Sequence, residues 1–202
     1  MAPVNMSLFS VNAILILSTD DKSRLLTRYF SAAHPPANTG PGISNPSANP
    51  YPTVKEQKAF EKGLMEKTNK TTSDVILYDN RVVVFKMEGD VMLYVVGGPE
   101  ENEVMLFSVV LALRDSLAIL LKNSTDKRTI VENYDLVSLA IDEIVDDGII
   151  LETDPVIIAS RVSKAPQQDA PTIRNIDLSE QGMLNIWEFG KSKLADRLRQ
   201  GL

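Results

Sequence analysis

The chain has 202 residues, of which 44% are hydrophobic and 24% charged, ordinary values for a globular protein with one substantial core. Its formal net charge of −6 argues against non-specific nucleic-acid binding, because such binding needs a basic surface that replaces phosphate counterions. The absence of cysteine excludes disulfides, thiolate nucleophiles and cysteine metal sites.

The first part of the chain predicts two strands and a loop. Residues 8–19 (LFSVNAILILST) predict a central strand, because both faces become apolar toward its end. Residues 24–30 (RLLTRYF) favour the returning strand of a hairpin, with a helix as the alternative that periodicity leaves open. Residues 34–52 hold six of the eleven prolines and predict a flexible surface loop or a disordered insertion.

An amphipathic helix is expected over residues 53–67. Thr53 is its predicted N-cap, and Glu56, three residues on, completes a capping box. The expected buried side consists of Val54, Phe60, Leu64 and Met65.

Three strands should follow, over residues 74–78, 82–87 and 91–96. Asp79-Asn80 and Glu88-Gly89-Asp90 are typical of hairpin turns between them. Three consecutive hairpin-type strands imply an antiparallel sheet with helices packed on it, which is an α+β fold.

The next segment, residues 104–121 (VMLFSVVLALRDSLAILL), predicts a helix that is apolar on almost every side. A helix on the surface of a lone domain shows one apolar stripe, so this one needs cover from its own sheet, from other helices and from another protein. We therefore expect the chain to be a component of an assembly, with Phe107 and Leu111 among the residues that contact its partner.

The remaining sequence predicts further helices. Residues 129–147 indicate a helical region broken near Asn133 and ended by Gly148, and Asp154-Pro155 can start a short helix over residues 156–162. Residues 163–177 indicate a linker and residues 178–202 a separate amphipathic helix. This last helix can dock on its own domain, in a partner's groove or on a membrane surface through one apolar stripe, which consists of Leu184, Trp187, Leu194 and Leu198.

Residues that carry chemistry are few. His34, the single histidine, stands in the proline-rich loop, where neither a catalytic triad nor a zinc site is expected. The acidic cluster at Asp142, Glu143, Asp146 and Asp147 indicates a solvated face or a contact with a basic partner, and less readily a Mg²⁺ or Ca²⁺ site. We expect no catalytic residue, no cofactor and no metal.

Three strings carry a family resemblance: YPTVKEQKAFEKGLMEKT, GGPEENEVMLFSVVLALRDSL and VENYDLVSLAIDEIVDDGIILETDP. They resemble the zeta subunits of coatomer, the COPI vesicle coat, a family related to the small (sigma) chains of clathrin adaptors. The similarity runs from about residue 8 to residue 162. It implies a longin-like domain over residues 1–162, with a five-stranded antiparallel sheet flanked by helices, followed by the linker and the C-terminal helical tail.

The resemblance also implies a role without catalysis. Zeta chains pair with the trunk of the large gamma-coatomer subunit, in a coat with other coatomer subunits that an Arf-family GTPase recruits. Such a chain is expected in the cytoplasm and on the cytoplasmic side of Golgi membranes and COPI-coated vesicles, in retrograde Golgi-to-ER and intra-Golgi transport. A sigma-type small chain of a clathrin adaptor and a longin-domain regulator of a small GTPase are the alternatives.

Overall fold

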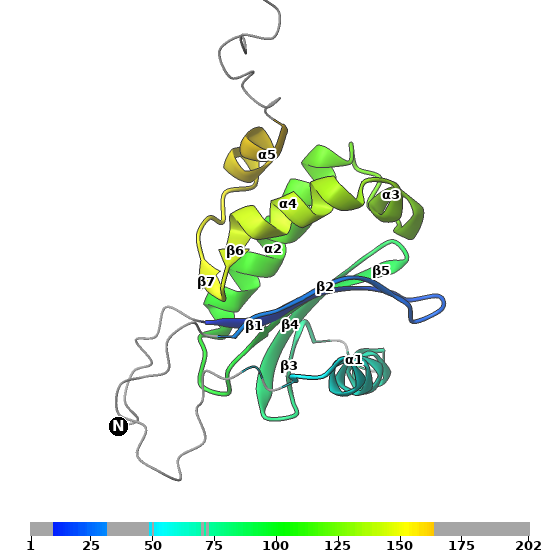
Figure 1. Cartoon of the computed structure of the whole chain (residues 1–202), viewed down its shortest axis with the longest axis vertical. Coiled ribbons are helices and arrows are strands. Elements are labelled where there is room, and N and C mark those ends of the chain that lie inside the picture. The colour runs from blue at the N-terminus through cyan, green and yellow to red at the C-terminus, as the bar shows by residue number, and fades with distance from the viewer. Residues whose placement is uncertain (1–9, 32–48, 50, 70, 72, 164–202) are drawn as a thin grey trace, which may run out of the picture. The chain divides into compact units, whose positions relative to one another are not determined.

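The structure, a computed structural model, describes residues 10–31, 49, 51–69, 71 and 73–163 (Figure 1). The chain divides into two units, Met1–Ser163 and Lys164–Leu202. The second unit, with the predicted C-terminal helix and almost all of the predicted linker, lies outside the described residues, and so do residues 34–48 and 50 of the predicted loop.

A five-stranded antiparallel sheet forms the centre of the first unit, as predicted. Its spatial order is β2-β1-β5-β4-β3, so β2 and β3 are the edge strands. Of the predicted segment 24–30, Arg24–Tyr29 form a strand and not a helix, because they pair antiparallel with β1. The strands are β1 (Val11–Ser18), β2 (Arg24–Tyr29), β3 (Val75–Tyr78), β4 (Arg81–Glu88) and β5 (Val91–Gly97).

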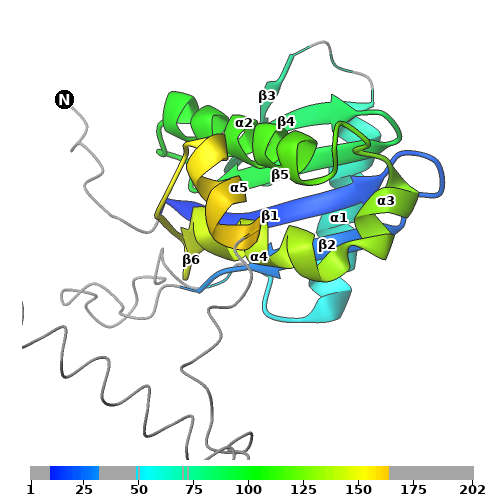
Figure 2. The same ribbon diagram turned by 90° about the horizontal axis from the view of Figure 1, so that it is seen from above.

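Helices cover both faces of the sheet and make three layers (Figures 1 and 2). One helix lies on one face and the others lie on the opposite face, with a two-stranded hairpin beside them. The helices are α1 (Val54–Thr68), α2 (Glu103–Leu120), α3 (Lys127–Glu132), α4 (Tyr134–Ile144) and α5 (Pro155–Ser163), and the hairpin is β6 (Val145–Asp146) with β7 (Ile149–Ile150). The buried apolar residues accordingly form two clusters, one between α1 and the sheet and one between the sheet and α2–α5.

Helix α1 begins as the sequence predicts. The Thr53 hydroxyl accepts a hydrogen bond from the Glu56 amide, and the Glu56 carboxylate accepts one from the Thr53 amide at 3.0 Å, which completes the capping box. The expected burial of Val54 is wrong, since this side chain is 59% exposed. Tyr51 packs there instead, 7% exposed, with its ring stacked on Phe60 at a centroid distance of 4.3 Å. This end of the predicted surface loop is therefore part of the core.

The predicted helical region over residues 129–147 breaks at Asn133, as expected, but it ends three residues early. Val145 leaves the helix with an extended backbone, φ −140° and ψ 125°, and pairs with Ile150 across the β6–β7 hairpin. The turn of this hairpin, Asp147-Gly148, has positive φ at both residues, as a two-residue hairpin turn requires.

Candidate interaction surface

Helix α2 is partly covered by its own domain. The side of α2 that contacts the sheet, α4 and α5 is fully buried, and its members are Leu106, Val109, Val110, Ala112, Leu113, Ser116 and Leu117. The other side is open. Val104 is 76% exposed, Met105 and Ile119 are also exposed, and Phe107 and Leu111 are half-buried. Much of the apolar excess of this helix is therefore ordinary core, and an outer apolar stripe remains.

Phe107 and Leu111, the two predicted partner contacts on this helix, are one turn apart and therefore lie on the same side of it. Phe107 packs partly against the α2-side core. The Lys86 ammonium lies 5.1 Å from the centroid of the Phe107 ring, and the same ammonium forms an ion pair with Asp74. A cation at this distance is attracted to the ring face. The side chain is thus held in place while part of it stays open to a partner.

Strand β3 adds a second apolar element on this face of the sheet. Leu77 pairs with Val82, and Val82 belongs to the α2-side core, so Leu77 points to the α2 side as well. Leu77 is 60% exposed. We call Leu77, Val104, Phe107 and Leu111 the α2–β3 face; Figure 2 shows α2 lying over the β4 side of the sheet, with β3 at its edge.

Side chains already bond to backbone groups at the unpaired edge of β3, which a further strand would need. The Ser73 hydroxyl donates to the Val75 carbonyl at 2.8 Å and accepts from the Val75 amide at 3.2 Å. The Lys67 ammonium donates to the Leu77 carbonyl at 2.9 Å. These side chains satisfy edge groups that another strand would otherwise use. A partner is therefore expected to meet the α2–β3 face with side chains and not by strand addition.

Two of the four carboxylates in the acidic cluster, those of Asp142 and Glu143, form ion pairs with arginines of the same chain. Asp142 lies 3.5 Å from Arg28, and Arg161 lies 3.3 Å from Glu143 and 3.5 Å from Glu152. No group of three potential metal-ligating side chains occurs within the ranges that the structure describes. Within the same ranges, no helix combines the length and apolarity that a membrane span requires. His34 lies outside them.

The remaining predicted contacts are not tested by the structure. Leu184, Trp187, Leu194 and Leu198 all lie outside the described residues. Leu77, in contrast, was missed from the sequence. The register of the β3–β4 hairpin would have identified it, because Leu77 pairs with Val82 and the two side chains lie on the same face of the sheet. Val82 is a buried core residue on that face.

Comparison with known proteins agrees with this architecture. The model of the clathrin adaptor complex small chain family matches residues 48–169. Coatomer subunit zeta of Saccharomyces cerevisiae is 40% identical over 198 residues, which cover 98% of this chain and 99% of the relative. Coatomer subunit zeta-1 of Homo sapiens is 37% identical over 188 residues, which cover 93% of this chain and 92% of the relative.

A solved-structure comparison supports the fold alone. A chain in a homology model of the full-length AP-3 complex, in a stretched open conformation, aligns with a TM-score of 0.53 at 14% sequence identity. The alignment covers 75% of this chain and 90% of the AP-3 chain. The five-stranded sheet with its flanking helices is therefore the small-chain fold of adaptor complexes.

Proposed function

The chain belongs to the clathrin adaptor complex small chain family, within its coatomer zeta group, and we propose that it pairs directly with the trunk of the large gamma-coatomer subunit. Membership in this group makes it a small subunit of the COPI vesicle coat. The proposed role is structural: the chain holds a partner in place and carries out no chemistry.

The α2–β3 face is the observation that supports this pairing. Four apolar side chains remain open or half-open here, whereas the side of α2 that contacts the sheet is buried in the core. Burying one Leu, Val or Phe side chain completely stabilises by about 1.5–3 kcal/mol. Several such residues, covered together, offer a large part of the free energy of a stable interface, although immobilising the two chains offsets some of it.

Pairing with gamma would place the chain in the cargo-adaptor core of the coat. We propose that an Arf-family GTPase recruits this core to the cytoplasmic side of Golgi membranes, together with the other coatomer subunits. The transport that it serves is retrograde, from the Golgi to the endoplasmic reticulum, and between Golgi cisternae. The proposal rests on the family relationship and on the apolar α2–β3 face.

Coexpression tests the proposal. Expressed alone, the chain should be poorly soluble, and coexpression with gamma should raise its soluble yield and shift it to a larger species in size exclusion. A monodisperse monomer that does not shift with gamma would contradict the pairing. Recovery of adaptin large chains in place of gamma would favour a sigma-type small chain, and faster nucleotide release from a small GTPase would favour a regulator.

A further inference from the structure

At the outer edge of strand β2, two residues direct their backbone groups away from the rest of the sheet. The Phe30 amide donates a hydrogen bond to the Asn12 carbonyl on β1 at 2.8 Å. In an antiparallel pair, successive residues in turn face the partner strand and face away from it. Tyr29 and Thr27, one and three positions before Phe30, therefore direct their amides and carbonyls away from β1. Since β2 is an edge strand, these groups line an open edge of the sheet.

The opposite edge of the sheet, β3, is protected at the corresponding positions. There the Ser73 hydroxyl and the Lys67 ammonium bond to outward-facing backbone groups. Within the part of the chain that the structure describes, the outward amides and carbonyls of Thr27 and Tyr29 have no hydrogen-bond partner. An edge with free backbone groups is a template for another extended chain, which carries donors and acceptors at the same spacing.

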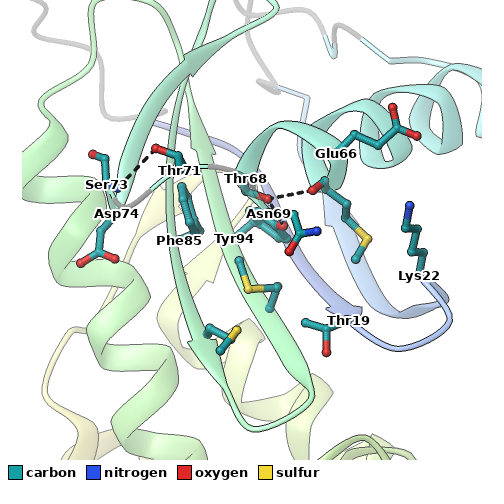
Figure 3. Close-up of a pocket in the computed structure, with 13 residues that line it drawn as sticks. Thr19, Lys22, Glu66, Thr68, Asn69, Thr71, Ser73, Asp74, Phe85 and Tyr94 are labelled. Atoms are coloured by element: carbon teal, nitrogen blue, oxygen red, sulfur yellow. Dashed lines mark hydrogen bonds between the residues drawn. The ribbon is translucent and has the colours of Figure 1, made fainter.

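A cleft of about 500 Å³ beyond the end of α1 is, in contrast, largely satisfied within the chain (Figure 3). The Tyr94 and Phe85 side chains that line it are buried. The Thr68 hydroxyl lies 2.8 Å from the Tyr94 hydroxyl, within hydrogen-bond distance, and the Thr19 hydroxyl donates to the Asp90 carbonyl at 3.0 Å. Less of this lining is therefore open to a ligand than of the β2 edge.

Helices flank the β2 edge on both faces of the sheet. On one face, the Tyr29 hydroxyl donates to the Glu61 carboxylate of α1 at 2.8 Å. On the other face, the Arg28 guanidinium donates to the Ser138 hydroxyl of α4 at 2.5 Å, and Figure 2 shows α4 next to β2. A strand added at this edge would therefore direct alternate side chains toward α1 and toward α4.

Arg28 lies between Thr27 and Tyr29 and restricts which chain can pair with them. Its side chain is 36% exposed and lies 3.5 Å from Asp142, so the guanidinium is accessible to a further carboxylate. Two copies of this chain, paired antiparallel through Thr27 and Tyr29, would bring their two Arg28 residues directly opposite each other. Like charges at such a position are unfavourable, whereas a carboxylate opposite Arg28 is favourable.

The segment that follows β2 in this chain is poorly suited to pair with this edge. Four prolines stand within residues 35–46, and proline has no N–H to donate to a neighbouring strand. The occupant expected at the β2 edge is therefore an extended segment of another protein.

We infer that the β2 edge binds an extended segment of a partner protein by antiparallel strand addition, with a carboxylate of that segment opposite Arg28. The regular part of the edge runs from Leu26 to Phe30, because the β1–β2 register shifts beyond Leu26. A segment of about five residues is enough to pair with it. Since β2 and β3 are opposite edges of the sheet, the inference stands apart from the proposed gamma pairing, and the two can fail separately.

The test uses the full chain, in the assembly in which it purifies, with its threonine and leucine methyl groups ¹³C-labelled. The probe is the capped pentapeptide acetyl-Thr-Val-Glu-Val-Thr-amide. With its Glu opposite Arg28, its two valines direct their N–H groups to the β2 edge, and the Glu directs its N–H away. N-methylation of both valines should therefore weaken binding at least about tenfold, whereas N-methylation of the Glu alone should leave it unchanged. Equal binding of these two methylated peptides would overturn the inference.

The methyl signals locate the peptide. We expect saturable shifts of the Thr27 signal and none of the Leu77 signal on β3, and equal shifts at both positions would overturn the inference. The peptide with Gln in place of Glu should bind about two- to fivefold more weakly. Equal affinity of the Glu and Gln peptides would contradict the carboxylate opposite Arg28.

Thr27 provides the matched variants. Thr27→Pro removes an outward N–H that takes no part in the β1 pairing, so the fold should be kept, and an unchanged urea midpoint checks this. It should weaken the unmodified peptide about tenfold or more, whereas Thr27→Val, which keeps the N–H, should not. Peptide binding that survives Thr27→Pro in the folded variant overturns the site.

Two further results would assign the edge to another occupant. Slow hydrogen exchange of the Thr27 and Tyr29 amides in the assembly without peptide would show that the edge is already paired. A dimer of the chain that Thr27→Pro dissociates would show that a second copy pairs with it. Either result would overturn the inference, which predicts fast exchange at both amides and no such dimer.

Discussion

The Arg24 guanidinium holds the Glu61 carboxylate with two hydrogen bonds, Nη2 to Oε1 at 2.6 Å and Nε to Oε2 at 3.0 Å. Glu61 is 6% exposed, and the Tyr29 hydroxyl donates a third hydrogen bond to it at 2.8 Å. Arg24 and Tyr29 stand on the edge strand β2 and Glu61 on α1. This network therefore joins α1 to β2, the far edge of the sheet from the α2–β3 face.

Removing the arginine should destabilise the domain, because it leaves a buried carboxylate without its cation. For Arg24→Met we expect the free energy of unfolding to fall by about 3 kcal/mol, near the lower end for a broken buried pair since Arg24 itself is partly exposed. Urea unfolding measures the loss. The double variant Arg24→Met/Glu61→Gln should recover part of it. A loss below about 1 kcal/mol in the single variant would show that the pair behaves as a surface ion pair.

Buried tyrosines should make the fold sensitive to alkali. Burial raises the pKa of Tyr94 to about 12. The pKa of Tyr29 is also raised, mainly by burial and, to a smaller extent, by the nearby Glu61 carboxylate. A phenol whose pKa is raised on folding stabilises the fold fully below its unfolded pKa of about 10, and this stabilisation disappears as the pH rises toward the folded value. The free energy of unfolding should therefore fall between about pH 10 and about pH 12.

Urea midpoints measured across that interval check this expectation. Tyr94→Phe should make the decline shallower, because it removes one of the groups that must ionise. Tyr134→Phe is the matched control: Tyr134 is exposed, so its replacement should not change the slope. Stability that stays constant through the interval would contradict the assignment.

Gly148 and Gly89 both have positive φ but differ in the space around them. Substituting each by Ala therefore distinguishes the cost of backbone strain from the cost of a steric clash. At Gly148, φ +84°, an added Cβ would lie 2.6 Å from the Val11 carbonyl oxygen. The Val11 amide also donates a hydrogen bond to the Gly148 carbonyl at 3.1 Å. At Gly89, φ +57°, the nearest atom is 3.6 Å away. Gly89→Ala should cost about 1 kcal/mol for its left-handed backbone, and Gly148→Ala at least about 2 kcal/mol more because the backbone must move. Equal losses in chemical unfolding would show that β6–β7 is not held against β1.

Much of the fold could be predicted because local patterns and final environment agree. Alternation and turn residues located all five strands of the sheet, and Thr53 with Glu56 marked the start of α1. Tyr51 was assigned to a surface loop because its neighbours are prolines and asparagines, whereas its burial depends on Phe60 and on the hydrogen bond to Asp79 across the sheet edge. The β6–β7 pairing escaped detection because strands of two residues carry no periodicity.

The candidate surface was predictable only in part. An almost wholly apolar helix pointed to Phe107 and Leu111 as partner contacts, but the sequence could not say which of its sides the domain covers. The contribution of Leu77 depends on strand register. The open edge of β2 follows from the strand order of the sheet and from which backbone groups face outward, and no single stretch of sequence reveals either.

The central claim, that the α2–β3 face binds the gamma trunk, is tested most directly by the affinity of matched charge variants. Leu77→Glu/Val104→Glu places two charges on this face at largely exposed positions, so the fold should be kept. Val54→Glu/Met87→Glu does the same on the α1 face, at comparable exposure. Each variant is coexpressed with gamma trunk and competing wild-type chain. The share of gamma trunk that each chain captures should show binding weakened at least about a hundredfold for the first pair, since two apolar contacts are replaced by desolvated charges, and unchanged for the second. Full affinity in Leu77→Glu/Val104→Glu would contradict the claim.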